Sequence, residues 1–412
     1  MHESLLRPQG QKDKDVTATL STSFVFIASI ILSAFLFNWA LSTSFHSQRD
    51  CEMGRVLEYL RSKLGAFCCR SLPADDGHES CSGPVCSSQQ PAIKRYGWSD
   101  IEALTENFAT VIGYGGFSTV YLGRSSVGLD PAVAMKVQYH GSDRLNLAFK
   151  QELDILLRLR HQNIVSLIGY CEDPDSGALV FEYVAGGDLH EKLHGEHAQE
   201  VLPWKARVKI AFQLAQALEY LHDKCDLHVV HGDLKPSNIL LVGEGAALKC
   251  KLCDFGSAKL GFSSTVLPPT MTKNHLRMTG SPGYVDPQYL RTGVASKKND
   301  IYSFGVVLLE MVMGVEAFCA ESGQILAVVA APALRDLDWR TAEGVKEMVD
   351  PRLEGEFEAD EARAMLHVAR LCLDPSPVLR PSAGGVIQIM NEQIPSICRL
   401  WSEKAAVSIH HR

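Results

Sequence analysis

Hydrophobic and polar residues are distributed along this 412-residue chain in three distinct patterns. Residues 24–41 are apolar at fifteen of eighteen positions and carry no charge. Residues 42–96 are rich in Ser, Cys, Gln and Pro. From residue 97 onward, short β-rich runs dominate up to Val184, and apolar residues then recur with the spacing of helices. The pattern predicts a small β-rich lobe followed by a larger helical lobe.

The apolar run at residues 24–41 is just long enough to cross a membrane as a helix. A helix needs about 20 apolar residues to span ~30 Å of hydrocarbon, and Trp39 lies near one end, as in an aromatic belt. Two other interpretations stay open. The core of a cleaved signal peptide is usually shorter, and a buried helix normally carries polar residues every third or fourth position. We predict a single transmembrane helix after a short tail at 1–23.

Residues 42–96 contain too little apolar surface to form a core, so we predict a juxtamembrane linker. Five of the twelve Cys of the chain lie in it. Cys68 and Cys69 are near the predicted span, which makes acylation one interpretation and unmodified thiols the simpler one. Cys81 and Cys86 lack a second pair of metal ligands, so we expect no zinc site there.

Composition excludes several classes of protein. With 46% hydrophobic and 21% charged residues, the chain has ample material for a core, which excludes a largely disordered or collagen-like protein. A formal net charge of −8 argues against nucleic-acid binding, because neutralising phosphates needs a basic face. We therefore predict one globular domain at 97–398, followed by a C-terminal tail at 399–412.

The first candidate site is a glycine-rich segment. Glycines let the backbone approach a polyphosphate closely and present its N–H groups. The sequence that follows is extended, which argues against a Rossmann nucleotide site and favours a hairpin over the phosphates. Glycine clusters also mark ordinary turns, so the segment alone is weak support. It consists of nine residues: Ile112, Gly113, Tyr114, Gly115, Gly116, Phe117, Ser118, Thr119 and Val120.

A second candidate is Lys136, which lies in the otherwise apolar strand A-V-A-M-K-V. If this cation points inward, it needs a partner. Glu152, in the amphipathic run that follows, is the candidate. A lysine held by a glutamate can reach the α- and β-phosphate oxygens of a nucleotide, although a lysine in a strand is more often a solvated surface residue.

The loop at 231–238, H-G-D-L-K-P-S-N, combines a carboxylate, an ammonium group and an amide oxygen before an apolar strand. Asp233 could accept a hydroxyl proton, and Lys235 could neutralise charge on a transferred phosphoryl group. Asn238 could hold a metal ion together with Asp254 of the D-F-G sequence, because Mg²⁺ prefers oxygen ligands. Each motif alone could be coincidence, but their order and spacing are very hard to explain in another way.

Together these motifs resemble those of protein kinases, and specifically the plant receptor-like kinases related to the Pelle family. The resemblance covers residues 107 to about 398. It implies an α+β, two-lobed protein kinase fold with an N-lobe at 107–184, a C-lobe at 185–398 and ATP in the cleft between them. It also implies that Phe181 is the gatekeeper and that Glu182, Tyr183 and Val184 form the hinge that meets the adenine.

The resemblance further implies the roles of the polar residues. Lys136, paired with Glu152, would grip the phosphates of ATP. Asp254 and Asn238 would bind Mg²⁺, and Asp233 would orient and deprotonate the substrate hydroxyl. Lys235 and Ser281 resemble the residues of Ser/Thr kinases rather than Tyr kinases.

Three departures from the family pattern stand out. Gly232 precedes the catalytic Asp, where many kinases carry an Arg that pairs with a phosphate on the activation loop, so the chain resembles the non-RD kinases. Ser118 replaces the third glycine of the glycine-rich loop. Gln288 replaces the Glu that usually pairs with the arginine matching Arg380, so we expect a Gln288–Arg380 hydrogen bond and a less rigid C-lobe.

The chain is therefore expected to be a membrane-anchored Ser/Thr kinase at the plasma membrane, with its kinase domain in the cytoplasm. Only about 23 residues precede the predicted span, too few for a folded ectodomain, so we expect a receptor or co-receptor as partner besides ATP and protein substrates. Two alternatives remain: a pseudokinase that acts as a scaffold, and a soluble kinase with a buried apolar N-terminal helix.

Overall fold

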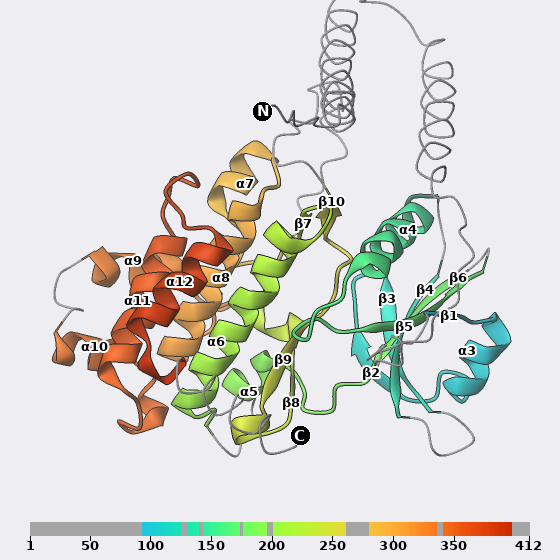
Figure 1. Cartoon of the computed structure of the whole chain (residues 1–412), viewed down its shortest axis with the longest axis horizontal. Coiled ribbons are helices and arrows are strands. Elements are labelled where there is room, and N and C mark those ends of the chain that lie inside the picture. Colours follow the sequence, from blue (N-terminus) through green and yellow to red (C-terminus); the bar gives the residue numbers. More distant parts are fainter. Residues whose placement is uncertain are drawn as a thin grey trace, which may run out of the picture. The chain divides into compact units, whose positions relative to one another are not determined.

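The computed structural model describes residues 93–124, 131–139, 143–173, 176–195, 201–260, 280–335 and 341–397. The predicted N-terminal tail, transmembrane helix, C-terminal tail and nearly all of the linker lie outside these residues. Within the described residues, we find no helix that combines the length and the apolar character needed to cross a membrane. The described residues form a β-sheet lobe and a helical lobe, as predicted (Figure 1).

The N-lobe sheet has six strands among the described residues, in the order β1-β5-β6-β4-β3-β2. All neighbours pair antiparallel except β1 and β5. The strands are β1 (Lys94–Arg95), β2 (Val111–Tyr114), β3 (Ser118–Gly123), β4 (Val133–Tyr139), β5 (Leu167–Glu172) and β6 (Ser176–Glu182).

Alternation along β4 decides where Lys136 points. Met135 and Val137 are fully buried in a cluster with Ile101 of helix α3 (Trp98–Leu104). Because successive side chains of a strand point to opposite faces, Lys136 points to the other face of the sheet. That face is covered by α4 (Asp143–Arg158), whose Phe149 packs so closely on Gly177 of β6 that a Cβ there would lie 2.6 Å from its ring. The sheet therefore directs Lys136 toward α4.

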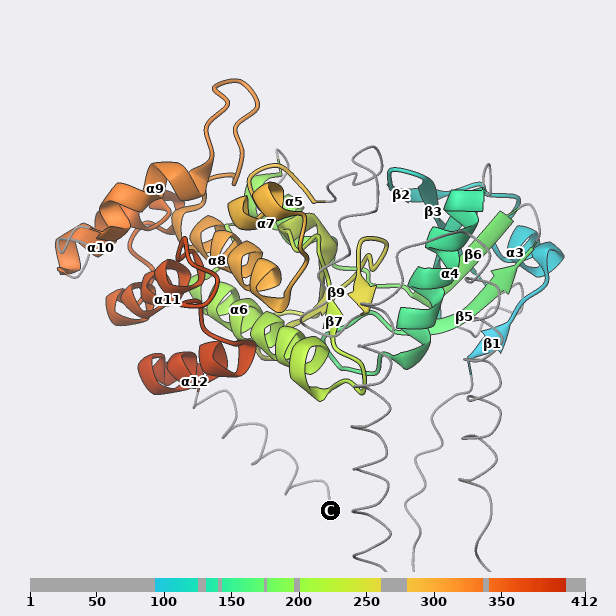
Figure 2. The same cartoon turned by 90° about the horizontal axis from the view of Figure 1, so that it is seen from above.

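The C-lobe is built around helix α8, which is buried at every residue from Asn299 to Val312. A helix that is apolar or buried all round belongs at the centre of a domain. Helices α6 and α11 pack against it, and α12 packs against both of them (Figure 2). The helices are α5 (Leu189–His194), α6 (Trp204–Glu219), α7 (Pro287–Thr292), α8 (Lys297–Met313), α9 (Leu326–Arg335), α10 (Ala342–Met348), α11 (Ala359–Cys372) and α12 (Ala383–Gln393).

Two short strand pairs lie where the C-lobe meets the N-lobe (Figure 1). They are β7 (Val229–Val230) with β10 (Lys259–Leu260), and β8 (Ile239–Val242) with β9 (Lys249–Leu252). Antiparallel pairing of Ile239 with Leu252 brings the start of β8 beside the end of β9. Asn238 and Asp254 are therefore neighbours although sixteen residues separate them in sequence.

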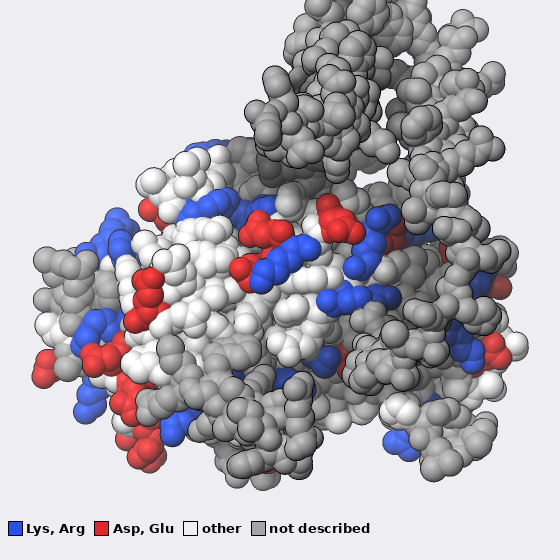
Figure 3. Space-filling model, viewed as in Figure 1, with Lys and Arg blue, Asp and Glu red and all other residues white. Residues whose placement is uncertain are grey.

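The charged surface carries both signs. On the face in Figure 3, Lys and Arg side chains of the described residues are interspersed with Asp and Glu, and they form no continuous basic band on that face. This distribution agrees with the slightly acidic net charge of the chain.

Candidate active site

Lys136 is the centre of the upper part of the site. Its Nζ lies 2.7 Å from Glu152 Oε1 and 2.7 Å from Asp254 Oδ1, so the predicted pairing with Glu152 is confirmed. Lys136 and Glu152 come from β4 and the helix that follows it, whereas Asp254 comes from the segment after β9, 118 residues beyond Lys136. One ammonium group therefore ties the sheet, helix α4 and the C-lobe segment together.

The electrostatics of this cluster favour the charged forms of Lys136 and Asp254, whereas burial raises the pKa of Glu152 above its ordinary value. Burial opposes the charge on Lys136, but the carboxylates of Glu152 and Asp254 outweigh it and raise the pKa of Lys136 above its ordinary value. Burial alone would raise the pKa of Asp254, yet the charge of Lys136 and its hydrogen bond lower this pKa to about 2. Asp254 is thus a carboxylate at every physiological pH, as a metal ligand must be.

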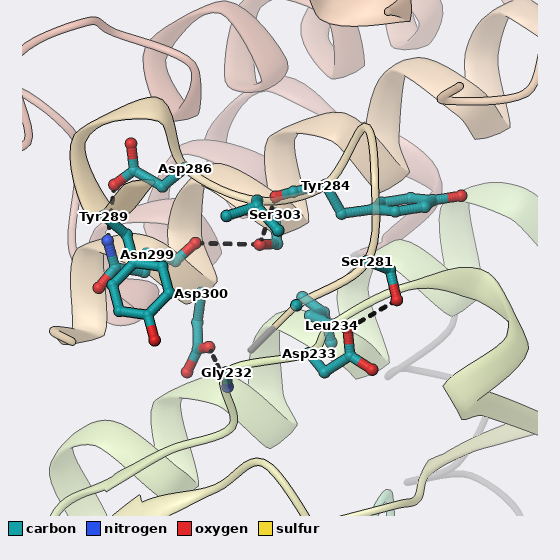
Figure 4. Close-up of a pocket in the computed structure, with 12 residues that line it drawn as sticks. Gly232, Asp233, Leu234, Ser281, Tyr284, Asp286, Tyr289, Asn299, Asp300 and Ser303 are labelled. Carbon is teal, nitrogen blue, oxygen red and sulfur yellow. Dashed lines mark hydrogen bonds between the residues drawn. The ribbon is translucent and has the colours of Figure 1, made fainter. Parts of the chain in front are cut away.

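The loop after β7 carries Asp233 and Lys235, and both contact Ser281. Figure 4 shows the hydrogen bond between Ser281 and Asp233. Ser281 Oγ donates to Asp233 Oδ1 at 2.9 Å and accepts from Lys235 Nζ at 2.8 Å. Lys235 Nζ is also 3.2 Å from Asp233 Oδ2. Asn238 Nδ2 donates to the Asp233 carbonyl at 2.8 Å, so the amide oxygen of Asn238 is the atom offered to a metal.

Asp300 of α8 holds this loop by accepting hydrogen bonds from its backbone, a role that the sequence did not predict. Its Oδ2 accepts from the His231 backbone N–H and lies 2.8 Å from His222 Nε2, and its Oδ1 accepts from the Gly232 N–H at 2.9 Å. Burial would raise the pKa of Asp300, but the His222 hydrogen bond and charge outweigh burial and lower it. Asp300 begins the sequence D-I-Y-S-F-G at 300–305, and its contacts with the loop can be seen only in the fold.

Gly232 occupies a backbone conformation that favours glycine. Its φ is +78°, and a Cβ there would lie 2.9 Å from the Ser257 carbonyl oxygen. An Arg at this position would be strained, and the loop or Ser257 would have to shift to make room for its Cβ. The cavity beside it, about 20 Å³, is lined by the loop, residues 280–286 and α8, and it is too small for a nucleotide (Figure 4).

The glycine-rich segment forms the predicted hairpin. Strands β2 and β3 pair antiparallel, and Gly115 N–H donates to the Ser118 carbonyl at 2.7 Å across the turn. Tyr114 and Phe117 are exposed near its tip. The remaining residues of 112–120 lie in the two strands or in the turn.

The side chain of Glu182, in the predicted hinge, is engaged by two other residues. Its carboxylate accepts from Lys251 Nζ at 2.7 Å and from the Ser166 N–H at 2.8 Å. Burial would raise the pKa of Glu182, but these hydrogen bonds outweigh burial and lower it. The backbone N–H groups of Glu182 and Tyr183 donate to the carbonyls of Ser166 and Ala132 at 3.1 and 3.3 Å, and contact between the hinge and an adenine stays a prediction. Phe181, the predicted gatekeeper, lies opposite Ala134 in the β4–β6 register.

The expected Gln288–Arg380 hydrogen bond is wrong. Arg380 instead makes a two-point ion pair with Asp286, with Nη1–Oδ2 and Nη2–Oδ1 distances of 2.6 and 3.0 Å, and both side chains are buried. Gln288 contacts Arg291. Asp286 caps the N-terminus of α7 and contacts Arg380 in the C-lobe, whereas Gln288, two residues later, contacts Arg291. The charge pair is retained, and the expectation of a less rigid C-lobe loses its basis.

Comparison with known proteins gives a consistent result. The protein kinase domain family matches residues 107–392. A receptor-like protein kinase of Arabidopsis thaliana is 49% identical over 77% of this chain and 94% of its own length. The salt tolerance receptor-like cytoplasmic kinase 1 of Oryza sativa subsp. japonica is 44% identical over 86% of this chain and 94% of its own length. A leucine-rich-repeat receptor-like serine/threonine-protein kinase of Arabidopsis thaliana is 39% identical over 73% of this chain and 32% of its own length.

Proposed function

Because this chain belongs to the protein kinase family and to its plant receptor-like branch, and is thus an ATP-dependent phosphotransferase, we propose that it phosphorylates serine and threonine hydroxyls of proteins. The observation that carries the proposal is the convergence of Lys136, Asp254, Asn238 and Asp233 from three separate segments. No residue of this set is replaced, which argues against the pseudokinase alternative.

The reaction proposed for the site is direct transfer. The substrate hydroxyl loses its proton to the Asp233 carboxylate while its oxygen bonds to the γ-phosphorus, and the bond from that phosphorus to the β–γ bridging oxygen breaks to release ADP. Lys235 neutralises charge on the transferred group, Lys136 holds the α/β oxygens, and the hairpin at 112–120 covers the phosphates.

Mg²⁺ is the metal we propose for Asn238 and Asp254. The donor set fits, because an amide oxygen and an ionised carboxylate are hard oxygen ligands and lie at the same end of the β8–β9 pair. When bound, the metal would supply charge neutralisation for the phosphate oxygens.

Replacing Ser281 tests the assignment to the Ser/Thr class. Ser281→Ala removes the hydroxyl that bridges Asp233 and Lys235, and we expect kcat to fall about tenfold, the effect of losing one such hydrogen bond. Ser281→Thr keeps the hydroxyl and should retain most of the activity. Steady-state assays of the full-length protein would measure both, and full activity of Ser281→Ala would contradict the bridging role.

Phosphoamino-acid analysis tests the acceptor directly. After incubation of the full-length protein with Mg²⁺, radiolabelled ATP and a general protein substrate, we expect label on phosphoserine and phosphothreonine. Label on phosphotyrosine alone would overturn the Ser/Thr assignment, and no label at all would favour the scaffold alternative.

We also propose that residues 24–41 anchor the protein in a membrane with the kinase domain in the cytoplasm, where a receptor or co-receptor would supply its signal. The support is the sequence of that segment, which is apolar at fifteen of eighteen positions and carries no charge. Full-length protein should remain in the membrane pellet after alkaline carbonate extraction, and a variant lacking 24–41 should not. Release of the full-length protein would favour the soluble alternative with a buried helix.

A further inference from the structure

A second cluster of ligand-type side chains lies away from the phosphate site. His190 and His194 of α5 and Glu310 of α8 each place one ligand atom within 4.8 Å of the other two. The two histidines are four residues apart, the spacing that puts side chains on one face of a helix. Their rings are tilted by 53° with centroids 5.3 Å apart. Nothing in the proposed phosphoryl transfer uses these three residues.

The innermost part of the cluster is tightly held. His194 Nε2 lies 2.8 Å from Glu310 Oε1, and the two side chains are 7% and 0% exposed. The other carboxylate oxygen, Oε2, accepts from the Tyr284 hydroxyl at 2.7 Å. A ligating carboxylate that is oriented by an outer hydrogen bond is the arrangement that metal sites use.

A buried His–Glu hydrogen bond needs no metal, so His190 is the informative residue. It adds a second imidazole within coordination reach of a pair that is already satisfied without it. Two imidazoles and one carboxylate form a donor set that suits Zn²⁺ and resembles the three-ligand zinc sites that leave one position open. Mg²⁺ and Ca²⁺, which prefer oxygen ligands, would not favour it.

We propose that His190, His194 and Glu310 bind one Zn²⁺ ion. Zinc would replace the hydrogen bond between His194 Nε2 and Glu310 Oε1, and the proton of the neutral His194 ring would move from Nε2 to Nδ1, leaving Nε2 free to bind the metal. With metal–ligand bonds of about 2.0–2.2 Å in tetrahedral geometry, the two atoms must separate to about 3.3 Å. Residues 190–194 match the H-E-x-x-H pattern that also occurs in zinc peptidases. Because α5 has only six residues, the inference concerns zinc binding alone.

The proposed zinc site is connected by hydrogen bonds to the segment that contacts Asp233 and Lys235. Tyr284, which donates to Glu310, lies three residues after Ser281, which contacts Asp233 and Lys235. Zinc that moves Glu310 would therefore act on residues 280–286. This consequence rests on the proposed function, whereas zinc binding itself does not.

Calorimetric titration of the metal-free full-length protein with zinc chloride tests the site. His190→Gln removes one ligand but keeps the His194–Glu310 hydrogen bond, so the variant should fold like wild type. We expect it to lose one equivalent of tight zinc binding, or to bind that equivalent about 100-fold more weakly. His367→Gln, which changes a histidine of α11 that contacts Gln393, is the matched control and should bind as wild type does.

Cysteines elsewhere in the chain can bind zinc too, so Co²⁺ absorption supplies the second readout. The equivalent lost in His190→Gln should lack the charge-transfer band that thiolate ligands give. Equal stoichiometry and affinity in wild type and His190→Gln would overturn the proposal, as would loss of a thiolate-type signal. Because binding is measured without ATP or substrate, an inactive kinase would leave this result readable.

Discussion

Replacing Asp286 with alanine is expected to lower the free energy of unfolding by about 3–5 kcal/mol, the usual cost of removing one partner from a buried ion pair. Asp286 accepts two hydrogen bonds from the Arg380 guanidinium, a third from Asn299 Nδ2 at 2.7 Å and a fourth from the Gln288 backbone N–H at 2.8 Å. Without the carboxylate, Arg380 stays buried with no countercharge. Chemical denaturation of the full-length protein, followed by fluorescence, would measure the change.

Gln288→Glu is the control for this prediction. It restores the residue that the family pattern contains, yet Gln288 is partly exposed and contacts Arg291 instead of Arg380. We therefore expect a change within about 0.5 kcal/mol, as for other surface substitutions. A neutral Asp286→Ala together with a clearly stabilising Gln288→Glu would show that Gln288 and not Asp286 is the partner of Arg380.

Replacing Lys136 with methionine is expected to lower kcat/KM at least about 100-fold. The substitution removes the cation that lies 2.7 Å from both Glu152 and Asp254, and it removes the group proposed to hold the phosphates. Steady-state kinetics with ATP and a protein substrate would measure the effect. Lys150→Met, which changes an exposed lysine of α4, should leave kcat/KM unchanged. A Lys136→Met enzyme with wild-type kinetics would rule out the assigned role.

The same substitution has a predicted pH signature. In the wild type, Asp254 has a pKa of about 2, below its ordinary value, so its ionised form favours the folded state. That contribution is present above the unfolded pKa and is lost only as the pH falls through about 2. In Lys136→Met the pKa of Asp254 should rise, because the effect of burial remains while the charge and hydrogen bond of Lys136 are lost. A new acid limb in the rate profile of the variant, and none from Asp254 in the wild type, is the expected outcome.

Local sequence was sufficient for features that depend on neighbours in one strand or loop. Alternation along β4 orients Lys136, and the H-G-D-L-K-P-S-N loop directly before β8 positions Asp233 and Asn238. What sequence missed depends on contacts between distant elements. Asp286 and Gln288 are two residues apart, and only the packing of α7 decides which of them meets Arg380. Asp300 contacts the loop that contains His231 because α8 packs beside β7, which precedes that loop.

Asp233 is the residue on which the proposed transfer depends most, and its replacement by asparagine tests it most directly. Asn is nearly the same size and can still accept from Ser281, but it cannot take a proton as a base. Phosphate incorporation from radiolabelled ATP would be compared in full-length wild type, Asp233→Asn and the control Asp226→Asn, which changes an exposed aspartate in the segment before β7. We expect a loss of about 10²–10⁴-fold in Asp233→Asn alone, with unchanged thermal stability. Equal incorporation by wild type and Asp233→Asn would contradict the proposed catalytic role.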